Sequence, residues 1–258
     1  MQDLKITTVQ TTLHWEDPVK NIKLLSEQLQ QVEDTDIIIL PEMFTTGFTM
    51  KPELLAEEAG GSGFRWMQKT AAEKQAVIVG SISVKDGRHY YNRLYWVNPD
   101  GSFLSYDKRH LFSMGKEHEH YTSGNQKLII THKGWKICPL ICYDLRFPVW
   151  SRNTQEDPYD LLIYVANWPE VRSYPWKQLL VARAIENQCY VAGVNRIGED
   201  GNGISHSGDT LVLNARGEVI NKTKAHENAS ETLALSSDEL AAFRKAFPVL
   251  NDADRFTV

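Results

Sequence analysis

The feature that most restricts the fold of this chain is the alternation of short apolar runs with helical segments. Residues 36–40 and 76–82 are almost wholly apolar and lack the polar alternation of a strand with one face in water. Such runs are typical of strands that are covered on both faces. The sequence therefore predicts an α/β fold in which mixed sheets pack against helices.

The first predicted helix is marked at its start and along one face. Asp17 suits the N-cap position, and Pro18 suits the first helical position, where no backbone N–H is needed. Apolar residues then recur at spacings of three, four and three, at Ile22, Leu25, Leu29 and Val32. This spacing predicts a single buried helical face.

The remaining predicted elements continue the alternation. Further strands are expected at residues 4–9, 160–166 and 189–194, and further helices at residues 64–75 and 176–188. Hairpins are expected where turn-forming residues separate two runs, namely 90–97 with 102–107, 128–131 with 135–141, and within 210–220. Ser236 and Glu239 have capping-box spacing, which predicts a last helix that ends before Pro248. Because no linker or repeat divides the chain, residues 1–258 are expected to form a single domain.

The charge and cysteine content of the chain restrict its partners and its compartment. The net charge is -5 at pH 7 and no basic run appears, which argues against nucleic acid or an anionic membrane as a partner. No window approaches the roughly 18 apolar residues that a membrane span requires, and the N-terminus lacks a signal pattern. Three cysteines are too few for a disulfide framework. We therefore expect a cytoplasmic protein with a free thiol and a small-molecule substrate.

Two reactive residues follow predicted strands, where ligands bind in open α/β sheets. Glu42 comes directly after Pro41, and a charged group there is unfavourable to desolvate unless it is paired or functional. A solvated glutamate is the competing interpretation. Cys142 follows the predicted strand 135–141 at a turn where a helix start can lower the pKa of a thiol. Cys138 and Cys189 are interpreted as small buried hydrophobes.

No metal site is expected. Cys138 and Cys142 lie four residues apart, so on a strand their side chains would be about 13 Å from each other, too far to share an ion. His118 and His120 could form a ligand pair with a neighbouring glutamate, but no second cluster completes the site. We therefore expect neither a metal nor a cofactor.

Three segments of the chain resemble the three catalytic motifs of the nitrilase superfamily. They are residues 40–44 (Leu-Pro-Glu-Met-Phe), 106–112 (Tyr-Asp-Lys-Arg-His-Leu-Phe) and 140–148 (Leu-Ile-Cys-Tyr-Asp-Leu-Arg-Phe-Pro). By itself, Lys108 would be interpreted as a solvated lysine at the end of a hairpin arm. Three motifs in the family's order are a specific match, and residues 92–95, 183–187 and 207–209 agree as well. The resemblance spans nearly the whole chain.

The resemblance implies both a fold and a mechanism. The implied fold is a four-layer αββα sandwich with two mixed sheets, and members of the family form dimers, so a homodimer is expected. Cys142 is implied to be the nucleophile and Glu42 the residue that moves protons. Lys108 and the backbone N–H of Tyr143 are implied to hold the oxyanion. The implied reaction is the hydrolysis of a small linear amide to a carboxylate and ammonia through a cysteine thioester.

Within the superfamily the chain looks closest to the omega-amidase branch, which hydrolyses terminal amides of short dicarboxylic acid derivatives such as 2-oxoglutaramate. Residues 117–124 (Glu-His-Glu-His-Tyr-Thr-Ser-Gly) carry this likeness. By its spacing to Gly124, Glu117 resembles the family's second active-site glutamate. Glu119 is the alternative register.

Substrate contacts are expected from three residues, Arg146, Phe44 and Trp168. Arg146 lies four residues after the catalytic cysteine, so a helix or turn that starts there would bring it back over the site. Its planar guanidinium is suited to a substrate carboxylate. A pairing of Arg146 with Asp144 or Glu186 is the competing interpretation.

Three other functions stay open at this point. The first is a Cys-His hydrolase with His110 or His206 as the base, although neither follows a buried strand as Glu42 does. The second keeps the three catalytic residues and acts on a nitrile, an N-carbamoyl amine or another linear amide, because those residues contact only the carbon-nitrogen centre. The third is a catalytically silent binding protein, and the presence of all three residues weighs against it.

Overall fold

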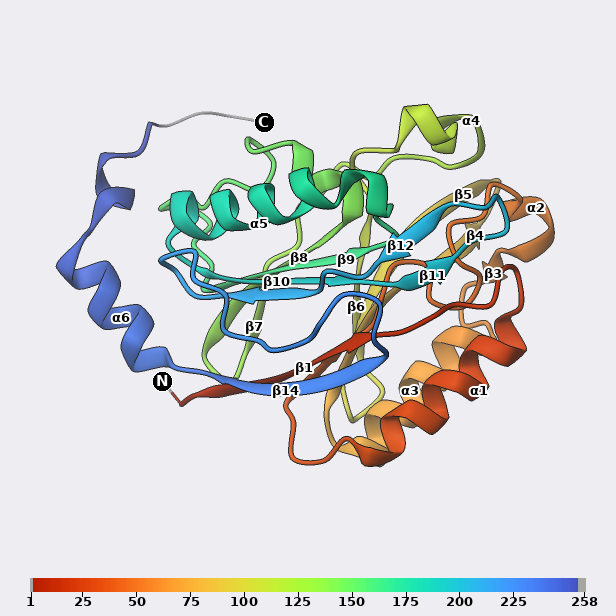
Figure 1. Ribbon diagram of the computed structural model, residues 1–258, viewed down its shortest axis with the longest axis horizontal. Helices are drawn as coiled ribbons and strands as arrows, with labels where there is room; N and C mark the ends of the chain where they lie inside the picture. Colours follow the sequence, from red (N-terminus) through yellow and green to blue (C-terminus); the bar gives the residue numbers. More distant parts are fainter. Residues whose placement is uncertain (1, 255–258) are drawn as a thin grey trace.

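Figure 1 shows two β-sheets packed face to face in the computed structural model, which describes residues 2–254. The first sheet has the strand order β14 (Ala229–Leu235), β1 (Leu4–Gln10), β2 (Ile37–Ile39), β4 (Val77–Asp86), β5 (His89–Val97) and β6 (Phe103–Asp107), with the short β3 (Glu57–Glu58) beside β4. The second has the order β13 (Leu211–Leu213), β10 (Tyr190–Asn195), β9 (Leu161–Ala166), β8 (Trp135–Ile141) and β7 (Ile130–His132). Both sheets combine parallel and antiparallel pairs, as predicted.

Helices cover the outer faces of the two sheets (Figure 1). α1 (Pro18–Gln28) and α3 (Ser62–Lys74) lie on the first sheet, and α5 (Ser173–Asn187) lies on the second. The predicted αββα sandwich is therefore confirmed. The smaller elements are α2 (Pro52–Leu55), α4 (Glu117–His120), α6 (Ser237–Ala246), and a ribbon of β11 (Ile197–Glu199) with β12 (Ser205–Ser207). Within residues 2–254, no helix is both long and apolar enough to cross a membrane.

The alternation of side chains along a strand divides each apolar run between two cores. In β2, Ile37 and Ile39 join the core between the two sheets, whereas Ile38 joins the core beneath α1 and α3. Residues 77–79 of β4 repeat this division. Because both faces of these strands are buried, neither face needs polar residues, which explains the unbroken apolar runs.

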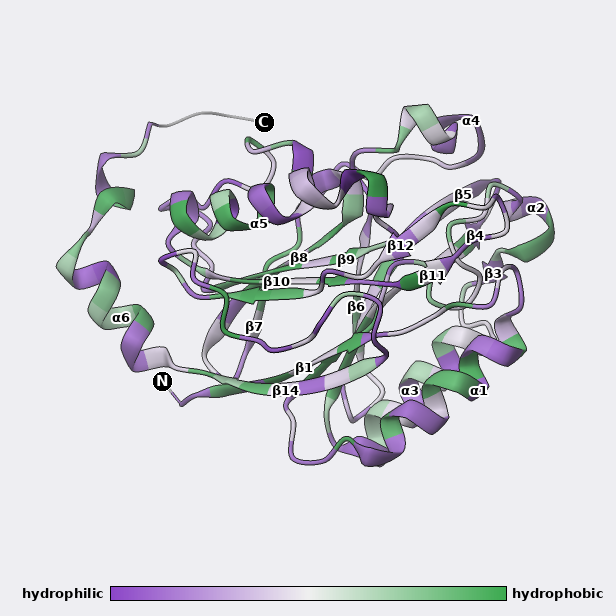
Figure 2. Cartoon of the chain, in the orientation of Figure 1, coloured by the Kyte–Doolittle hydropathy of each residue, from purple (hydrophilic) through white to green (hydrophobic). Residues whose placement is uncertain are grey.

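The first helix begins as predicted. The Asp17 carboxylate accepts the Lys20 N–H at 3.0 Å, and Pro18 occupies the first helical position. Figure 2 shows both hydrophilic and hydrophobic residues along α1. Leu25 on the predicted apolar face is fully buried, whereas Ile22 is only partly buried. The helix is therefore amphipathic and packs through the expected face.

Gly193 in β10 lets α5 lie directly on the second sheet. A Cβ at this position would lie 2.5 Å from Leu180 Cδ1 and 2.9 Å from Trp176 Cζ2, both on α5. Any side chain there would push the helix away from the sheet. The helix position matters for the site because Arg183 of α5 donates to the Leu145 carbonyl at 2.6 Å, directly beyond β8.

The C-terminal part departs from the sequence prediction in two ways. The hairpin within residues 210–220 forms around a turn at residues 214–217, with the Ile220 N–H donating to the Val212 carbonyl at 2.8 Å, but its second arm is not a strand and meets Leu211–Leu213 through the single bridge Leu213↔Val219. The sequence also does not predict β14, which pairs with β1 from Leu4↔Leu235 to Gln10↔Ala229. Most residues of β14 are partly or fully exposed, so this edge strand has no continuous apolar run. The last helix is as predicted: Ser236 Oγ caps it and it ends before Pro248.

The strand ends bring four polar residues to one region of the sandwich. Glu42 follows β2, Cys142 follows β8, and Asn167 follows β9, and all three strands run parallel to a neighbour in their sheet. Lys108 follows β6. The fold therefore delivers the predicted reactive residues from both sheets to one place.

Candidate active site

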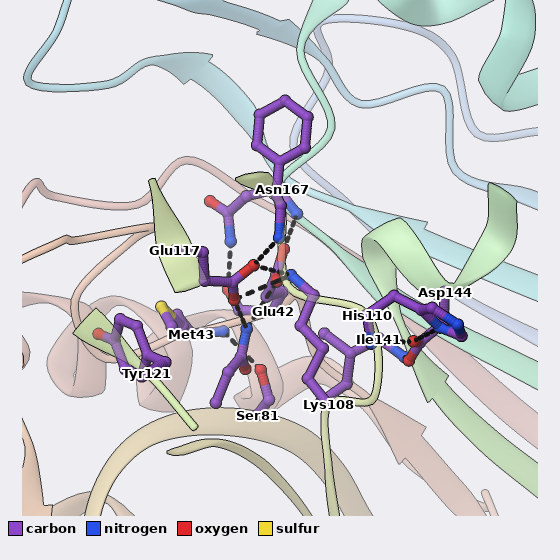
Figure 3. Close-up of polar contacts among 12 residues, drawn as sticks. Glu42, Met43, Ser81, Lys108, His110, Glu117, Tyr121, Ile141, Asp144 and Asn167 are labelled. Carbon is purple, nitrogen blue, oxygen red and sulfur yellow. Dashed lines mark hydrogen bonds and ion pairs between the residues drawn. The ribbon is translucent and has the colours of Figure 1, made fainter. Parts of the chain in front are cut away.

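The centre of the candidate site is a lysine between two glutamates (Figure 3). Lys108 Nζ lies 2.8 Å from Glu42 Oε1, and 3.0 and 2.9 Å from the two carboxylate oxygens of Glu117. The three side chains are 0–1% exposed. A lysine that contacts two buried carboxylates is held firmly, because its removal would leave two buried negative charges without a cation.

Burial and pairing act in opposite directions on the ionisation of this cluster. Burial lowers the pKa of Lys108, but the negative charges of Glu117 and Glu42 outweigh it and raise the pKa well above its ordinary value. Lys108 is therefore an ammonium at neutral pH. Burial raises the pKa of Glu117, the Lys108 charge opposes this, and the charge of Glu42 adds to it.

Further donors satisfy the carboxylate oxygens. Asn92 Nδ2 donates to Glu42 Oε1 at 2.8 Å and to Glu117 Oε1 at 3.1 Å. The Phe112 backbone N–H donates to Glu117 Oε2 at 2.6 Å, and the Asn167 backbone N–H donates to Glu42 Oε2 at 2.8 Å. Each carboxylate oxygen has at least one donor, so both carboxylates are fixed in orientation.

The chain turns sharply after Glu42, and Ser81 of β4 holds the turn. Met43 has φ 42°, a left-handed conformation that is unfavourable for a residue with a side chain. Its N–H donates to Ser81 Oγ at 2.9 Å, and the Phe44 N–H donates to the Ser81 carbonyl at 3.1 Å (Figure 3 shows the first of these bonds). The strained turn aims the Glu42 carboxylate back toward Lys108.

Cys142 occupies a second left-handed turn, at the start of the short 3-10 helix Cys142–Arg146. Its φ is 41°, and the residue is 8% exposed. Burial raises the pKa of its thiol well above the ordinary value, and the neighbouring Glu42 charge raises it further. The resting side chain is therefore a thiol. Cys138 and Cys189 are fully buried in the larger hydrophobic core cluster, as predicted.

Asp144 connects the cysteine turn to the lysine loop (Figure 3). Its Oδ2 accepts the Ile141 N–H at 3.0 Å and the Tyr106 hydroxyl at 2.8 Å. Its Oδ1 accepts the His110 N–H at 3.0 Å and lies 2.8 Å from His110 Nδ1. Tyr106 and His110 stand two residues before and after Lys108. One buried carboxylate thus connects the turn of Cys142 to the loop of Lys108.

A small cavity of about 140 Å³ opens above Cys142 and Lys108. Its volume lies below the roughly 300–1,000 Å³ of sites for drug-sized ligands, which favours a small substrate. Its wall consists of Phe48, Met50, Lys108, Phe112, Gly115, Cys142, Tyr143, Arg146, Asn167, Trp168, Pro169, Arg172, Asp200, Asn202, Ile204 and His206. At its exposed end, the guanidinium of Arg146 lies 5.0 Å from the Trp168 ring centre, and that of Arg172 lies 5.3 Å from the Phe112 ring centre.

Two of the three predicted substrate contacts line this cavity. Arg146 and Trp168 do so, but Phe44 does not. Phe44 is 0% exposed and packs in the core beneath α1 and α3, 5.5 Å from the ring of Trp66. The prediction for Phe44 is therefore wrong, because the turn after Glu42 directs this ring into the core. Phe48, four residues later, takes the place in the cavity wall.

The alternatives for Arg146 and for the second glutamate are decided by the geometry. Asp144 is occupied by the contacts described above, and Glu186 pairs with Arg183 at 2.9 Å, so neither forms an ion pair with Arg146. Glu117 is 0% exposed against Lys108, whereas Glu119 is exposed on the other side of α4. Glu117 is therefore the residue beside the reactive cluster.

The histidines lie outside the reactive cluster. His110 contacts Asp144 and stacks on Phe147 at a ring distance of 3.8 Å. His206 lines the cavity, with a pKa lowered to about 4 by burial and by the charge of Arg196. His118 is exposed on α4, and no group of three potential metal ligands occurs within residues 2–254. The expectation that no metal takes part stays a prediction.

Four residues of the site have no role assigned by the sequence prediction: Asn92, Asn167, Arg172 and Phe48. Asn167 directly follows the predicted strand 160–166, so the same strand-end rule that selects Glu42 would have selected it. Asn92 belongs to residues 92–95, which agree with the family. Its position between the two glutamates, however, depends on how β5 pairs with β6, which the sequence does not reveal. Phe48 lies in an irregular segment and Arg172 ends the short 3-10 helix Glu170–Arg172, and neither segment has a local pattern that reveals which side chains face a cavity.

Comparison with known proteins agrees with this geometry. The family model described as carbon-nitrogen hydrolase matches residues 5–245, and the chain belongs to this family. It is 46% identical to an omega-amidase, YafV, of Escherichia coli strain K12 over 99% of both chains. It is 32% identical to a 2-oxoglutaramate amidase of Bacillus subtilis strain 168 over 96% of both chains. The crystal structure of XC1258 from Xanthomonas campestris, a CN-hydrolase superfamily protein with an arsenic adduct in its active site, covers all of both chains with a TM-score of 0.98 at 42% identity.

Proposed function

We propose that the protein is a cysteine-dependent amidase of the omega-amidase type. It hydrolyses the terminal amide of a short dicarboxylic acid monoamide, including 2-oxo acids such as 2-oxoglutaramate, to a carboxylate and ammonia. One observation carries this proposal: a small cavity has Cys142 and Lys108 at its buried end and Arg146 and Arg172 at its exposed end. The first pair suits an amide carbonyl, and the second suits a carboxylate a short chain away. The similarity to the Escherichia coli and Bacillus subtilis amidases supports the same substrate class.

In the first step the Cys142 sulfur attacks the amide carbon while its proton moves to Glu42. Because the thiol pKa is raised, the proton leaves during the attack rather than before it. Glu42 is suited to accept it, since Lys108, Asn92 and the Asn167 N–H hold its carboxylate in place. Glu42 is thus held in position to take the proton.

The carbonyl oxygen becomes an oxyanion that needs preorganised donors. The Lys108 ammonium supplies a full positive charge from a buried side chain. Tyr143 is the second residue of a short helix, and the first N–H groups of a helix have no partner within it. Loss of one such donor typically lowers the rate about a hundred- to a thousand-fold. Glu117 contributes indirectly, because it binds Lys108 through both oxygens and so sets the direction of the ammonium.

Glu42 then acts a second and a third time. It returns its proton to the nitrogen as the carbon-nitrogen bond breaks, which releases ammonia and leaves a thioester on Cys142. It next takes a proton from the water that attacks the thioester, and it gives that proton back to the sulfur as the acid departs. Every step uses one carboxylate at one place, so no cofactor or metal is needed.

We also propose that residues 1–258 act as a single domain and that two copies form a homodimer in the cytoplasm. One core cluster contains side chains of both sheets, which supports a single domain. On and before α5, Val171, Tyr174 and Ile185 are 83%, 75% and 51% exposed, and this outer apolar surface supports pairing with a second copy. All three cysteines are free and buried, in keeping with a reducing compartment. Light scattering of the purified protein tests the dimer.

An ammonia-release assay tests the proposed activity. The panel contains monoamides of short dicarboxylic and 2-oxo dicarboxylic acids, neutral amides of equal length, a nitrile and an N-carbamoyl amine. We expect the monoamides to be preferred, Cys142→Ala to abolish release, and the matched controls Cys138→Ala and Cys189→Ala to keep most of it. Appreciable turnover by Cys142→Ala would refute the mechanism, and preference for a nitrile or carbamoyl substrate would refute the substrate class.

A further inference from the structure

One polar atom at the buried end of the cavity has no partner. Asn167 lines the cavity beside Cys142 and Lys108, and the residue is only 6% exposed. Its Oδ1 is buried and accepts no hydrogen bond from any group within residues 2–254. Buried polar atoms are nearly always satisfied. Asn92 Oδ1 also lacks a partner, but Asn92 does not line the cavity, so Asn167 Oδ1 is the acceptor that a ligand in the cavity can meet.

The orientation of the Asn167 amide is determined by its other contacts. Its Nδ2 donates to the backbone carbonyl of Glu42 (Figure 3). A flipped amide would place Oδ1 against that carbonyl, where two acceptors would repel each other. Nδ2 therefore stays on Glu42, and Oδ1 stays on the other side as a preorganised acceptor.

The contacts of Asn167 also place it on a particular side of the reacting carbon. Its backbone N–H donates to Glu42 Oε2 at 2.8 Å, and the residue lines the cavity beside Cys142. Lys108 instead binds Glu42 Oε1. The oxyanion belongs on the side of Lys108, so the departing nitrogen belongs on the side of Glu42 Oε2 and Asn167.

We propose that Asn167 Oδ1 accepts an N–H of the scissile amide and that the site thereby selects primary carboxamides. This inference rests on the proposed amide hydrolysis. Oδ1 holds one N–H while the sulfur-carbon bond forms, which directs the nitrogen lone pair toward the proton on Glu42. As the carbon-nitrogen bond breaks, the nitrogen takes that proton and leaves as ammonia. Asn167 gains and loses no proton.

The test compares a monoamide with the methyl ester of the same acid. The ester uses the same sulfur, oxyanion donors and proton transfer, but its leaving group carries no N–H. In Asn167→Ala, we expect the ratio of kcat/KM for the amide to kcat/KM for the ester to fall about ten- to a hundred-fold below the wild-type ratio. This is the range expected when a site loses a hydrogen bond to one substrate and not to its competitor.

Two further variants separate this role from a structural one. Asn167→Asp keeps an acceptor and loses the Nδ2 donor, so both substrates should slow while their ratio stays within about threefold of wild type. Asn195→Ala is the matched control, because Asn195 is a buried asparagine at the end of β10 with both ends of its amide partnered, to Trp168 N at 2.8 Å and Gly208 O at 2.7 Å. It should also leave the ratio unchanged.

Each outcome has one meaning. A fall in the ratio that is specific to Asn167→Ala supports the inference. An equal loss on amide and ester in Asn167→Ala, or an equal fall in the ratio in Asn167→Asp, overturns it and leaves Asn167 as a support for Glu42. If the wild type releases no ammonia from any amide, the proposed function itself fails, and the two failures are thereby distinguished.

Discussion

The two ends of the cavity differ in whether their cations are paired with carboxylates. At the buried end, Lys108 lies within 3.0 Å of Glu42 and Glu117, and all three side chains are excluded from solvent. At the open end, Arg146 and Arg172 face aromatic rings, and no carboxylate within residues 2–254 forms an ion pair with either. The first group is complete without a ligand, whereas the second is not.

Under the proposed function, this difference separates the groups that act on the amide from the groups that bind the substrate. Groups that must act on a small electrophile gain from being fixed before the substrate arrives, because no reorganisation is then needed during the reaction. Cations that must bind a substrate carboxylate gain from having no internal partner to release. Substitutions at the buried end should therefore change kcat strongly, and substitutions at the open end should change KM modestly.

Among the three charged residues of the buried end, the largest expected effect is at Glu42. Glu42→Gln keeps the shape of the side chain and removes the proton acceptor, so acylation and thioester hydrolysis should each slow about a hundred- to ten-thousand-fold. Single-turnover measurements separate the two steps. Glu117→Gln is the matched control, since Glu117 acts through Lys108, and its effect should be at least tenfold smaller. Mild and equal effects at both positions would contradict this division of labour.

A second prediction concerns His206 in the cavity wall and the pH dependence of protein stability. Burial and the neighbouring Arg196 lower the pKa of His206 to about 4, below the value of about 6.5 in an unfolded chain. Between these values the unfolded state binds more protons, so stability should fall as the pH falls from 6.5 to 4, by up to about 3 kcal/mol. Urea unfolding across this window should show the loss, and His206→Asn should flatten it. An unchanged pH dependence in this variant would show that His206 is not the group involved.

The sequence predicts most of the scaffold because burial on both faces leaves a local signature. Strands such as β2 and β4 are apolar without interruption, and the capping residues of α1 and α6 mark helix starts. β14 escapes prediction because its stability comes from pairing with β1, more than 200 residues away. No local pattern records a partner at that distance.

The proposed catalytic residues are easier to predict from sequence than the cavity that surrounds them. Glu42, Lys108 and Cys142 belong to contiguous motifs and follow strands. Phe44 belongs to the same motif as Glu42, yet Met43 has a left-handed backbone that turns the Phe44 ring into the core. That turn depends on contacts with Ser81 of another strand, so sequence proximity alone could not reveal it.

A third prediction tests whether the buried end depends on its scaffold. Asp144→Asn replaces a carboxylate with a neutral amide. This weakens the hydrogen bonds that join the cysteine turn to the loop of Lys108 through Tyr106 and His110. A small misplacement of reacting groups lowers kcat, here by about ten- to a hundred-fold, with KM nearly unchanged. Because Asp144 only positions other groups, the pH profile of kcat should keep its shape. A shifted profile would instead assign a proton-transfer role to the Asp144 and His110 pair.

The smallest expected effects are at the open end, and they test the substrate assignment most directly. Arg146→Lys and Arg172→Lys keep the charge and lose the planar fork, so each should raise KM for a dicarboxylic monoamide about five- to thirty-fold and leave kcat unchanged. Arg172 is the less exposed of the two, so its contact with a carboxylate is less weakened by water and its substitution should have the larger effect. A neutral amide of equal length provides the control, because it has no carboxylate to lose. Equal losses on both substrates would assign these arginines to the structure of the cavity wall, and a wild-type preference for the neutral amide would overturn the omega-amidase proposal.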